Sequence, residues 1–124
     1  TDTGSTYKSG ASDYRYSAST VDQAGNISVE PHSAADTKII LSGNIGNAAA
    51  EHAVLRICIS RVSESSIYKF IRWELTATNG TPVFYETRGS GLYIADGAVI
   101  DALRFLMSTG NITATAVLYG RRKA

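Results

Sequence analysis

The feature that most constrains this chain is a regular alternation of apolar and polar residues in two successive segments, residues 53–60 and 67–78. Side chains two positions apart in a strand share one face, whereas a helix needs apolar residues three or four positions apart. Asn79-Gly80, two residues that tolerate positive φ, separates the second segment from the β-rich residues 82–88. These segments therefore predict antiparallel strands with one apolar face, the last two joined as a hairpin.

Further short strands are expected on both sides of this region. The chain is rich in Ser, Thr, Ala, Ile and Val and contains 11 Gly but only 2 Pro, which suits strands separated by turns. Glycine-rich stretches such as residues 89–91 are interpreted as breaks between strands. The additional strands are predicted just before Pro31 and at residues 14–19, 37–42, 92–95, 99–107 and 112–119.

About seven to eight short strands with frequent turns are typical of a sandwich rather than of alternating strands and helices. We therefore expect an all-β fold, an antiparallel β-sandwich or jelly roll, in a single domain that spans residues 1–124. Residues 99–107 are the least settled part, because Val99, Leu103 and Leu106 also fit a helix. The turn signal at Gly110-Asn111 and the alternation after it favour the strand.

Composition argues against several classes of function. The 12 Lys and Arg residues are balanced by 11 Asp and Glu, so the net charge of +1 provides no field for nucleic acid. No apolar run approaches the roughly 18–20 residues that cross a bilayer. The single Cys58 and the 2 His residues exclude a disulfide framework and make structural zinc improbable. We expect no cofactor, metal, membrane or nucleic-acid partner.

The chemistry of a catalytic site is not evident in the sequence. The carboxylates of Glu64, Glu74, Glu86 and other acidic residues are scattered, and no nucleophile-elbow pattern occurs. The chain is therefore predicted not to be an enzyme. Cys58, in the middle of a predicted strand, is interpreted as an inert thiol in the core or in a subunit contact.

Aromatic side chains are the strongest candidates for ligand contacts. Tyrosine and tryptophan combine a large apolar area with a hydrogen-bonding tip, which suits both protein interfaces and the faces of sugars. Tyr14 and Tyr16 lie in a polar, glycine-flanked segment, whereas the apolar neighbours of Trp73 also fit a place in the core. The candidate ligand-binding residues are Tyr14, Tyr16, Trp73 and Tyr85.

Both ends of the chain resemble one protein family when they are considered together. The segment DTGSTY at Asp2–Tyr7 resembles a segment of β-sandwich domains in tail-fibre and tailspike-type virion proteins of tailed bacteriophages. Residues 100–123 resemble the end of those domains: a hydrophobic strand, a turn, and a last strand that finishes in Leu118-Tyr119-Gly120. The alternating segments in between fit the same order, so the resemblance covers nearly the whole chain.

The resemblance implies a virion protein on the phage tail or capsid surface. Such a module is expected to form a homotrimer, to contact other virion proteins and to bind a receptor on the host surface, a glycan, without catalysis. A capsid head-fibre or decoration protein with purely structural contacts is the alternative, and a polysaccharide depolymerase fragment is the enzymatic one. Family members carry a strand before the segment at Asp2–Tyr7. We therefore expect a longer chain, or a neighbouring chain that supplies this strand.

Overall fold

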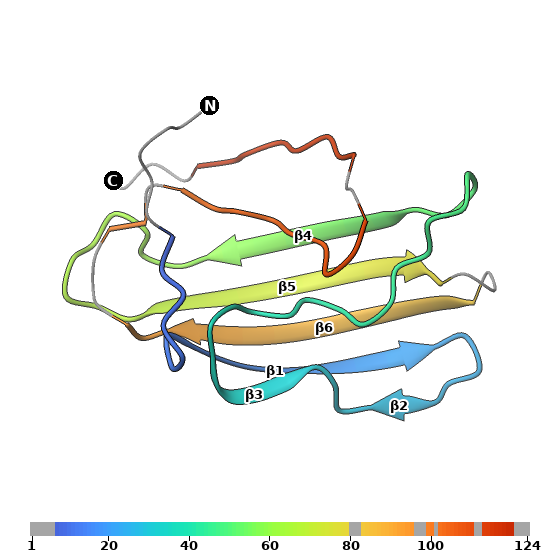
Figure 1. The fold of residues 1–124 in the computed structure, drawn as a ribbon, viewed down its shortest axis with the longest axis horizontal. Coiled ribbons are helices and arrows are strands. Elements are labelled where there is room, and N and C mark those ends of the chain that lie inside the picture. Colours follow the sequence, from blue (N-terminus) through green and yellow to red (C-terminus); the bar gives the residue numbers. More distant parts are fainter. Residues whose placement is uncertain (1–6, 80–82, 96–98, 101, 111–112, 121–124) are drawn as a thin grey trace.

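The computed structural model describes residues 7–79, 83–95, 99–100, 102–110 and 113–120. Its regular structure is one antiparallel sheet of six strands, and none of these residues is helical (Figure 1). The expected all-β antiparallel class is therefore confirmed. The strands are β1 (Tyr14–Asp22), β2 (Ile27–Ser28), β3 (His32–Asp36), β4 (Ala53–Ile59), β5 (Lys69–Thr78) and β6 (Phe84–Tyr93).

The strands lie in the order β2-β1-β6-β5-β4, and β3 also pairs with β1. The N-terminal strand is thereby placed next to β6, aligned from Tyr14 opposite Tyr93 to Asp22 opposite Tyr85. β4, β5 and β6 are successive antiparallel neighbours, as the alternation in the sequence predicts. The two ends of the sheet differ: β1 is flanked by two short strands, whereas the seven-residue β4 ends the sheet on the other side.

The predicted hairpin between β5 and β6 is confirmed. Thr78 lies opposite Phe84 at the end of the ladder. The backbone N–H of Asn79 donates to the carbonyl of Val83 at 3.1 Å, and the side-chain oxygen of Asn79 accepts the N–H of Val83 at 3.1 Å. Gly80, the other residue of the turn signal, lies outside the described residues.

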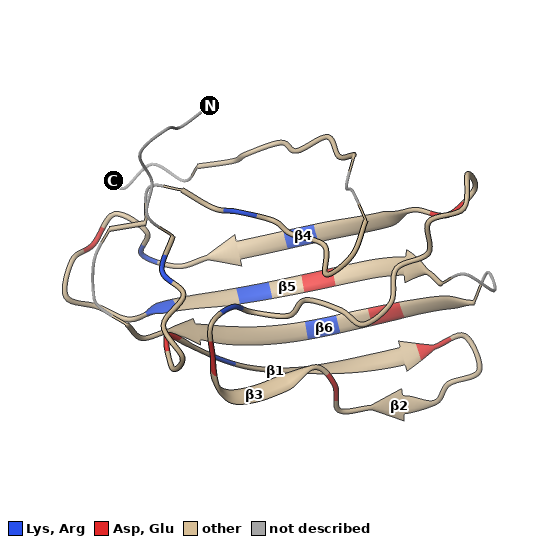
Figure 2. Ribbon diagram, in the orientation of Figure 1, with Lys and Arg blue, Asp and Glu red and all other residues tan. Residues whose placement is uncertain are grey.

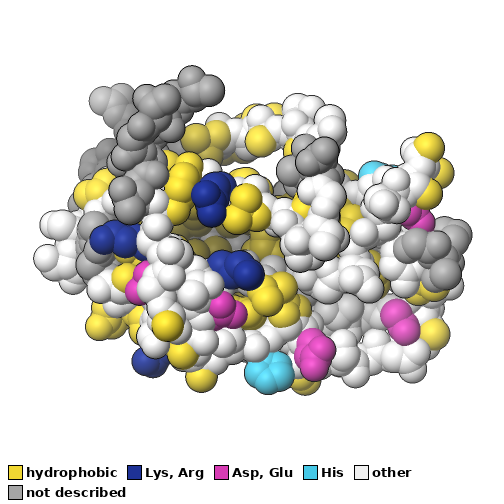
Figure 3. All heavy atoms as spheres, viewed as in Figure 1, with side chains coloured by type: hydrophobic (Ala, Val, Ile, Leu, Met, Phe, Trp, Pro, Cys, Tyr) yellow, Lys and Arg dark blue, Asp and Glu magenta, His cyan; other side chains and the backbone are white. Residues whose placement is uncertain are grey.

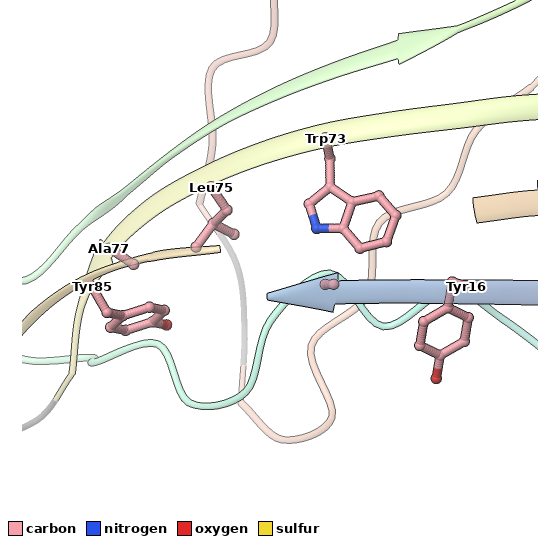
Figure 4. Packing of buried hydrophobic residues seen from close by; sticks show 6 residues of the cluster. Tyr16, Trp73, Leu75, Ala77 and Tyr85 are labelled. Carbon is pink, nitrogen blue, oxygen red and sulfur yellow. The ribbon is translucent and has the colours of Figure 1, made fainter. Parts of the chain in front are cut away.

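The two faces of the sheet differ in burial. On the inner face of β5, Trp73, Leu75 and Ala77 are buried, and Figure 4 shows their side chains on the same side as Tyr16 and Tyr85. The residues between them on β5 are exposed on the outer face. Residues 37–52, here called the covering segment, cross the inner face from β3 to β4 (Figure 1). Its apolar residues Ile39, Leu41 and Ile45 pack against the core.

Two predictions in this region were wrong. Residues 37–42 do not form a strand, because their apolar side chains lie on the face of the sheet and the segment is not paired at an edge. Residues 89–91 do not break the chain, since β6 runs through them as far as Tyr93. The glycines face the core, where the indole of Trp73 and the side chain of Ile39 occupy the space that side chains would need.

The predicted strands at 99–107 and 112–119 were also wrong for the residues that the structure describes there. Residues 99–100, 102–107 and 113–119 form neither strand nor helix, and Asn111 and Ile112 lie outside the described part. Alternation produces a strand only where an edge offers hydrogen-bond partners. With other described residues, they make one backbone bond outside the strands, from the N–H of Ile100 to the carbonyl of Val62 at 2.9 Å. A second sheet is not formed by the described residues.

Candidate functional site

Two of the aromatic residues singled out from the sequence hold the covering segment on the sheet. Trp73 is 2% exposed, and its indole N–H donates to the carbonyl of Leu41 at 2.9 Å. The hydroxyl of Tyr85 lies 3.0 Å from the hydroxyl of Ser42 and donates to the carbonyl of Asn44. The polar tips of these buried rings are therefore satisfied by the backbone and side chains of the covering segment.

Tyr16 and Tyr14 hold other parts of the chain. The hydroxyl of the buried Tyr16 donates to the carboxylate of Asp36 at 2.9 Å. Burial and this hydrogen bond raise the pKa of Tyr16 to about 12, and the same bond lowers the pKa of the Asp36 carboxyl. The half-buried Tyr14 donates to the carbonyl of Lys8 at 3.0 Å, and its ring centroid lies 5.4 Å from that of Tyr93. All four candidate aromatics thus lie on the inner face.

A pocket of about 360 Å³, here called the polar pocket, opens beside the covering segment. It is formed by the β1–β2 hairpin, the residues before β3, the covering segment and the end of the β5–β6 hairpin. Of the four candidate aromatics, Tyr85 contributes to this lining. The polar residues most relevant to binding are Thr20, Ser28, Glu30, Ser42, Asn44 and Tyr85.

The two carboxylates that line the polar pocket have different roles. The carboxylate of Asp22 accepts the backbone N–H groups of Ala24 and Asn26, each at 2.9 Å, and the side-chain amide of Asn26 at 2.8 Å. These bonds lower the pKa of Asp22 and hold the turn between β1 and β2. The carboxylate of Glu30 makes no hydrogen bond or ion pair with the described residues. It is therefore the carboxylate that is available to a ligand.

This arrangement suits neutral polar ligands. A carboxylate accepts hydrogen bonds from hydroxyl groups, whereas side-chain amides and hydroxyls both donate and accept. Small-molecule sites combine such groups with apolar contact, here supplied by Ile40, Pro31 and the ring of Tyr85. The polar pocket can therefore surround a ligand that carries several hydroxyl groups.

The sequence interpretation missed Ser28, Glu30 and Asn44. Ser28 ends the two-residue strand β2, Glu30 lies between β2 and β3, and Asn44 lies in the covering segment. Polar residues are common in such short connections for reasons of backbone geometry alone. They come together only because β1 brings its hairpin next to the covering segment. Tyr16, by contrast, lines a shallow depression of about 300 Å³ together with Arg15 and Phe70.

The outer face of the sheet has a different chemistry. Cross-strand register aligns Arg56 of β4, Glu74 of β5 and Arg88 of β6 in one row (Figure 2). The guanidinium of Arg88 also contacts Glu86 at 2.7 Å on its own strand. Further exposed residues of this face are Arg15, Arg72, Phe70 and Cys58. The exposed position of Cys58 excludes a core thiol.

Hydrophobic side chains are also exposed at the covered side of the molecule. Figure 3 shows them between the covering segment and the C-terminal part of the chain, and again along that part. Leu55 of β4 is 38% exposed, although its neighbour Leu75 in β5 is 3% exposed. The inner face is therefore well covered over β5 and less so over β4.

The described residues offer neither a metal site nor a membrane-spanning helix. Within them, no group of three or more His, Cys, Asp or Glu side chains is placed to hold a metal ion. The part of the chain that the structure describes also contains no helix of the length and hydropathy needed to span a bilayer. Comparison with protein-family models, with curated proteins and with solved structures finds no match to this chain.

Proposed function

We propose that this chain is a non-enzymatic virion module of the tail-fibre or spike type, which binds a glycan of the host surface in the polar pocket. The observation that carries the proposal is the lining of this pocket by hydroxyls, an amide and the available carboxylate of Glu30. The resemblance of Asp2–Tyr7 and of residues 100–123 to phage fibre domains supports the virion setting.

The proposed contacts follow from the chemistry of sugars. The Glu30 carboxylate accepts hydrogen bonds from ring hydroxyls, and the side chains of Asn44 and Ser28 donate to ring oxygens. Tyr85 is 7% exposed, so it offers a ring edge rather than a full stacking face. Binding therefore depends mainly on polar contacts, and the proposal includes no chemical step.

A glycan array with the full chain tests this proposal, followed by titration of any glycan that binds. Glu30→Gln keeps the shape of the side chain and removes its charge, and we expect affinity to fall about tenfold or more, equivalent to about 1.4 kcal/mol. Glu74→Gln, on the outer face, is the matched control and leaves affinity unchanged. Absence of any glycan binding, or equal losses in the two variants, contradicts the proposal.

The proposal includes a finer architecture and assembly. The sheet is one layer of a β-sandwich, and the second layer is completed in a homotrimer that contacts other virion proteins on the phage tail or capsid surface. The alternative, a capsid head-fibre or decoration protein with purely structural contacts, is favoured by the exposed apolar residues Leu106, Val117 and Leu118. Immunogold labelling of intact particles distinguishes the two positions.

A second candidate function, binding of single-stranded nucleic acid, is favoured by the outer face. The net charge of +1 argues against binding of nucleic acid, but the net charge does not describe how the charges are distributed over the surface. Four arginines gather on the outer face of β1, β4, β5 and β6, against Glu74 and Glu86. Phe70 on the same face is 61% exposed, and nucleic-acid sites combine such cations with aromatic platforms.

Fluorescence anisotropy with a labelled 20-nucleotide RNA tests the second candidate. Four phosphate contacts on a single strand predict a loss of affinity of about 50-fold between 50 and 200 mM salt. Arg72→Ala weakens binding and lowers the salt dependence, whereas Arg104→Ala, whose guanidinium lies 4.8 Å from the ring of Tyr7, does not. Equal affinities of the two variants exclude this face as the site.

A further inference from the structure

The free edge of β4 is an unused hydrogen-bonding surface in the part of the chain that the structure describes. β4 pairs with β5, and its other side has no strand there. The N–H of Ser60 donates to the carbonyl of Phe70 at 2.9 Å, and the carbonyl of His52 accepts from Thr78 at 3.4 Å. In an antiparallel ladder such pairs alternate. The backbone groups that point to the free edge therefore belong to Ala53, Leu55, Ile57 and Ile59.

The opposite end of the sheet is protected against further pairing. The edge of β1 that points away from β6 pairs with β2 and β3, which are two and five residues long. Pro31 lies between these two short strands. Short strands and proline are common means of blocking an edge. β4 has seven residues, no proline, and Arg56 as its only charge. An edge of this kind attracts another strand.

Residues 113–120, here called the C-terminal segment, have the pattern of a strand without a partner. Their sequence, TATAVLYG, alternates and contains β-branched and aromatic residues. All eight residues are exposed, and none of them makes a hydrogen bond with another described residue. Val117, Leu118 and Tyr119 are 70%, 92% and 88% exposed. Such a run gains free energy when another surface covers it.

We propose that the C-terminal segment of one copy of this chain adds as a strand to the β4 edge of a second copy. The eight residues of the segment match the seven of β4, because both strands rise about 3.3 Å per residue. The apolar residues of the segment on one face then extend the row of Leu55 and Ile57 on the inner face, where the exposure of Leu55 shows incomplete cover. Backbone bonds supply affinity, and the alternating side chains set the register.

A second copy of the chain would provide a partner both for the free edge of β4 and for the C-terminal segment. Among the residues that the structure describes, neither the free edge of β4 nor the C-terminal segment has a strand partner, although each could satisfy the other. Exchange between copies gives every β4 edge a strand, either in a reciprocal pair or around a ring. Strand exchange would form the contact between subunits of the oligomer that is part of the proposed function. It does not depend on glycan binding. A negative glycan array therefore leaves it unaffected.

Cysteine crosslinking with full chains tests the exchange. Cys58, the only cysteine of the chain, lies on β4 and is exposed. The backbone N–H and carbonyl of Cys58 point toward β5. An added strand would therefore meet Cys58 in a non-hydrogen-bonded pair, where the side chains are closest. The wild type is mixed with Cys58→Ser variants that carry Ala114→Cys, Thr115→Cys, Ala116→Cys or Val117→Cys. Each chain then has one thiol, so every disulfide joins two copies.

We expect one of the four positions to give a disulfide to Cys58 in at least fivefold higher yield than the control Cys58→Ser/Ala11→Cys. Ala11 lies in an exposed turn of the N-terminal loop. Yields equal to the control at all four positions overturn the proposal. A chain that carries both Cys58 and the favoured new cysteine, and that closes only an internal disulfide, also overturns it, because the segment then pairs with its own β4.

Light scattering gives an independent measurement. Proline lacks the N–H that a ladder needs, so Ala116→Pro or Val117→Pro weakens association at least tenfold. Ala116→Ser is the matched control and keeps the mass of the wild type. At dilutions where the wild type is monomeric, circular dichroism of all the variants remains that of the wild type, because the C-terminal segment makes no hydrogen bonds with other described residues. A wild type that is monomeric at all concentrations, or proline variants that associate as it does, contradicts the proposal.

Discussion

Gly89 of β6 lies directly opposite Trp73 of β5, and the indole of Trp73 covers it. A Cβ atom at position 89 would lie 2.1 Å from Cζ2 of the indole, far closer than two carbon atoms can approach. The glycine therefore makes room for the largest side chain of the core. The carbonyl of Leu41 accepts the indole N–H, so this one pairing connects β6, β5 and the covering segment.

Gly89→Ala is expected to destabilise the fold, because the indole must move away from the core and from Leu41. Overpacking of this kind costs about 1–3 kcal/mol. Gly43→Ala is the matched control, since a Cβ there meets no atom within 4 Å, and we expect a change of less than about 1 kcal/mol. Urea denaturation of both variants measures the difference, and equal midpoints contradict the role assigned to Gly89.

Tyr85→Phe is expected to lower the free energy of unfolding by about 1–2 kcal/mol. The variant keeps the ring but removes the hydroxyl that bonds to Ser42 and to the carbonyl of Asn44. Tyr68→Phe, at a side chain that is 56% exposed, serves as the control and should change stability little. Thermal unfolding followed by circular dichroism compares them. Equal losses in both variants show that the Tyr85 hydroxyl does not hold the covering segment.

The Tyr16–Asp36 pair predicts a loss of stability in alkali. The pKa of Tyr16 is raised from its ordinary value near 10 to about 12, because burial and the bond to Asp36 favour the protonated hydroxyl. The contribution of the protonated Tyr16 hydroxyl to the free energy of unfolding is therefore complete below pH 10 and is lost as pH rises through 12. The free energy of unfolding of the wild type should fall across this range. Tyr16→Phe should fall less steeply, and parallel curves contradict the prediction.

The same pair predicts a loss of stability in acid. The pKa of the Asp36 carboxyl is lowered, first by the Tyr16 hydrogen bond, so its contribution is present above the ordinary pKa near 3.9 and is lost as pH falls through the lowered value. Asp36→Asn should remove this acid-dependent part. Denaturant midpoints between pH 2 and pH 6 provide the measurement, and a variant with an unchanged acid profile rules out the assignment.

Leu118→Asp is expected to leave the fold intact and to weaken association. A residue that is 92% exposed contributes little to the core, so the unfolding free energy should stay within about 0.5 kcal/mol of that of the wild type. A carboxylate in a strand interface is costly to bury, so the apparent dissociation constant of the oligomer should rise at least tenfold. Denaturation and light scattering separate the two effects. Unfolding of the variant would show that Leu118 belongs to a core.

Residues 53–88 were the most predictable part of the fold. Strand alternation is a local property, and here it agrees with the pairing of β4, β5 and β6. A short apolar run predicted a strand at 37–42 and alternation predicted one at 112–119, and the structure forms neither in the residues it describes. A strand also needs a neighbouring edge, and the covering segment lies across a face instead. The prediction of a break at residues 89–91 was wrong because glycine breaks many strands, whereas here Gly89 faces the indole of Trp73 and Gly91 faces Ile39.

The candidate site depended even more on tertiary structure. The sequence by itself determined an all-β antiparallel chain, the apolar faces of its long strands and a place for Trp73 that fits the core. Only the tertiary structure decided that Tyr85 is held by the covering segment, that Glu30 and Asn44 line one pocket, and that the arginines share the outer face. Periodicity is set by neighbours along the chain. Pockets, edges and charged faces are set by contacts between residues that are distant in sequence, which alternation does not encode.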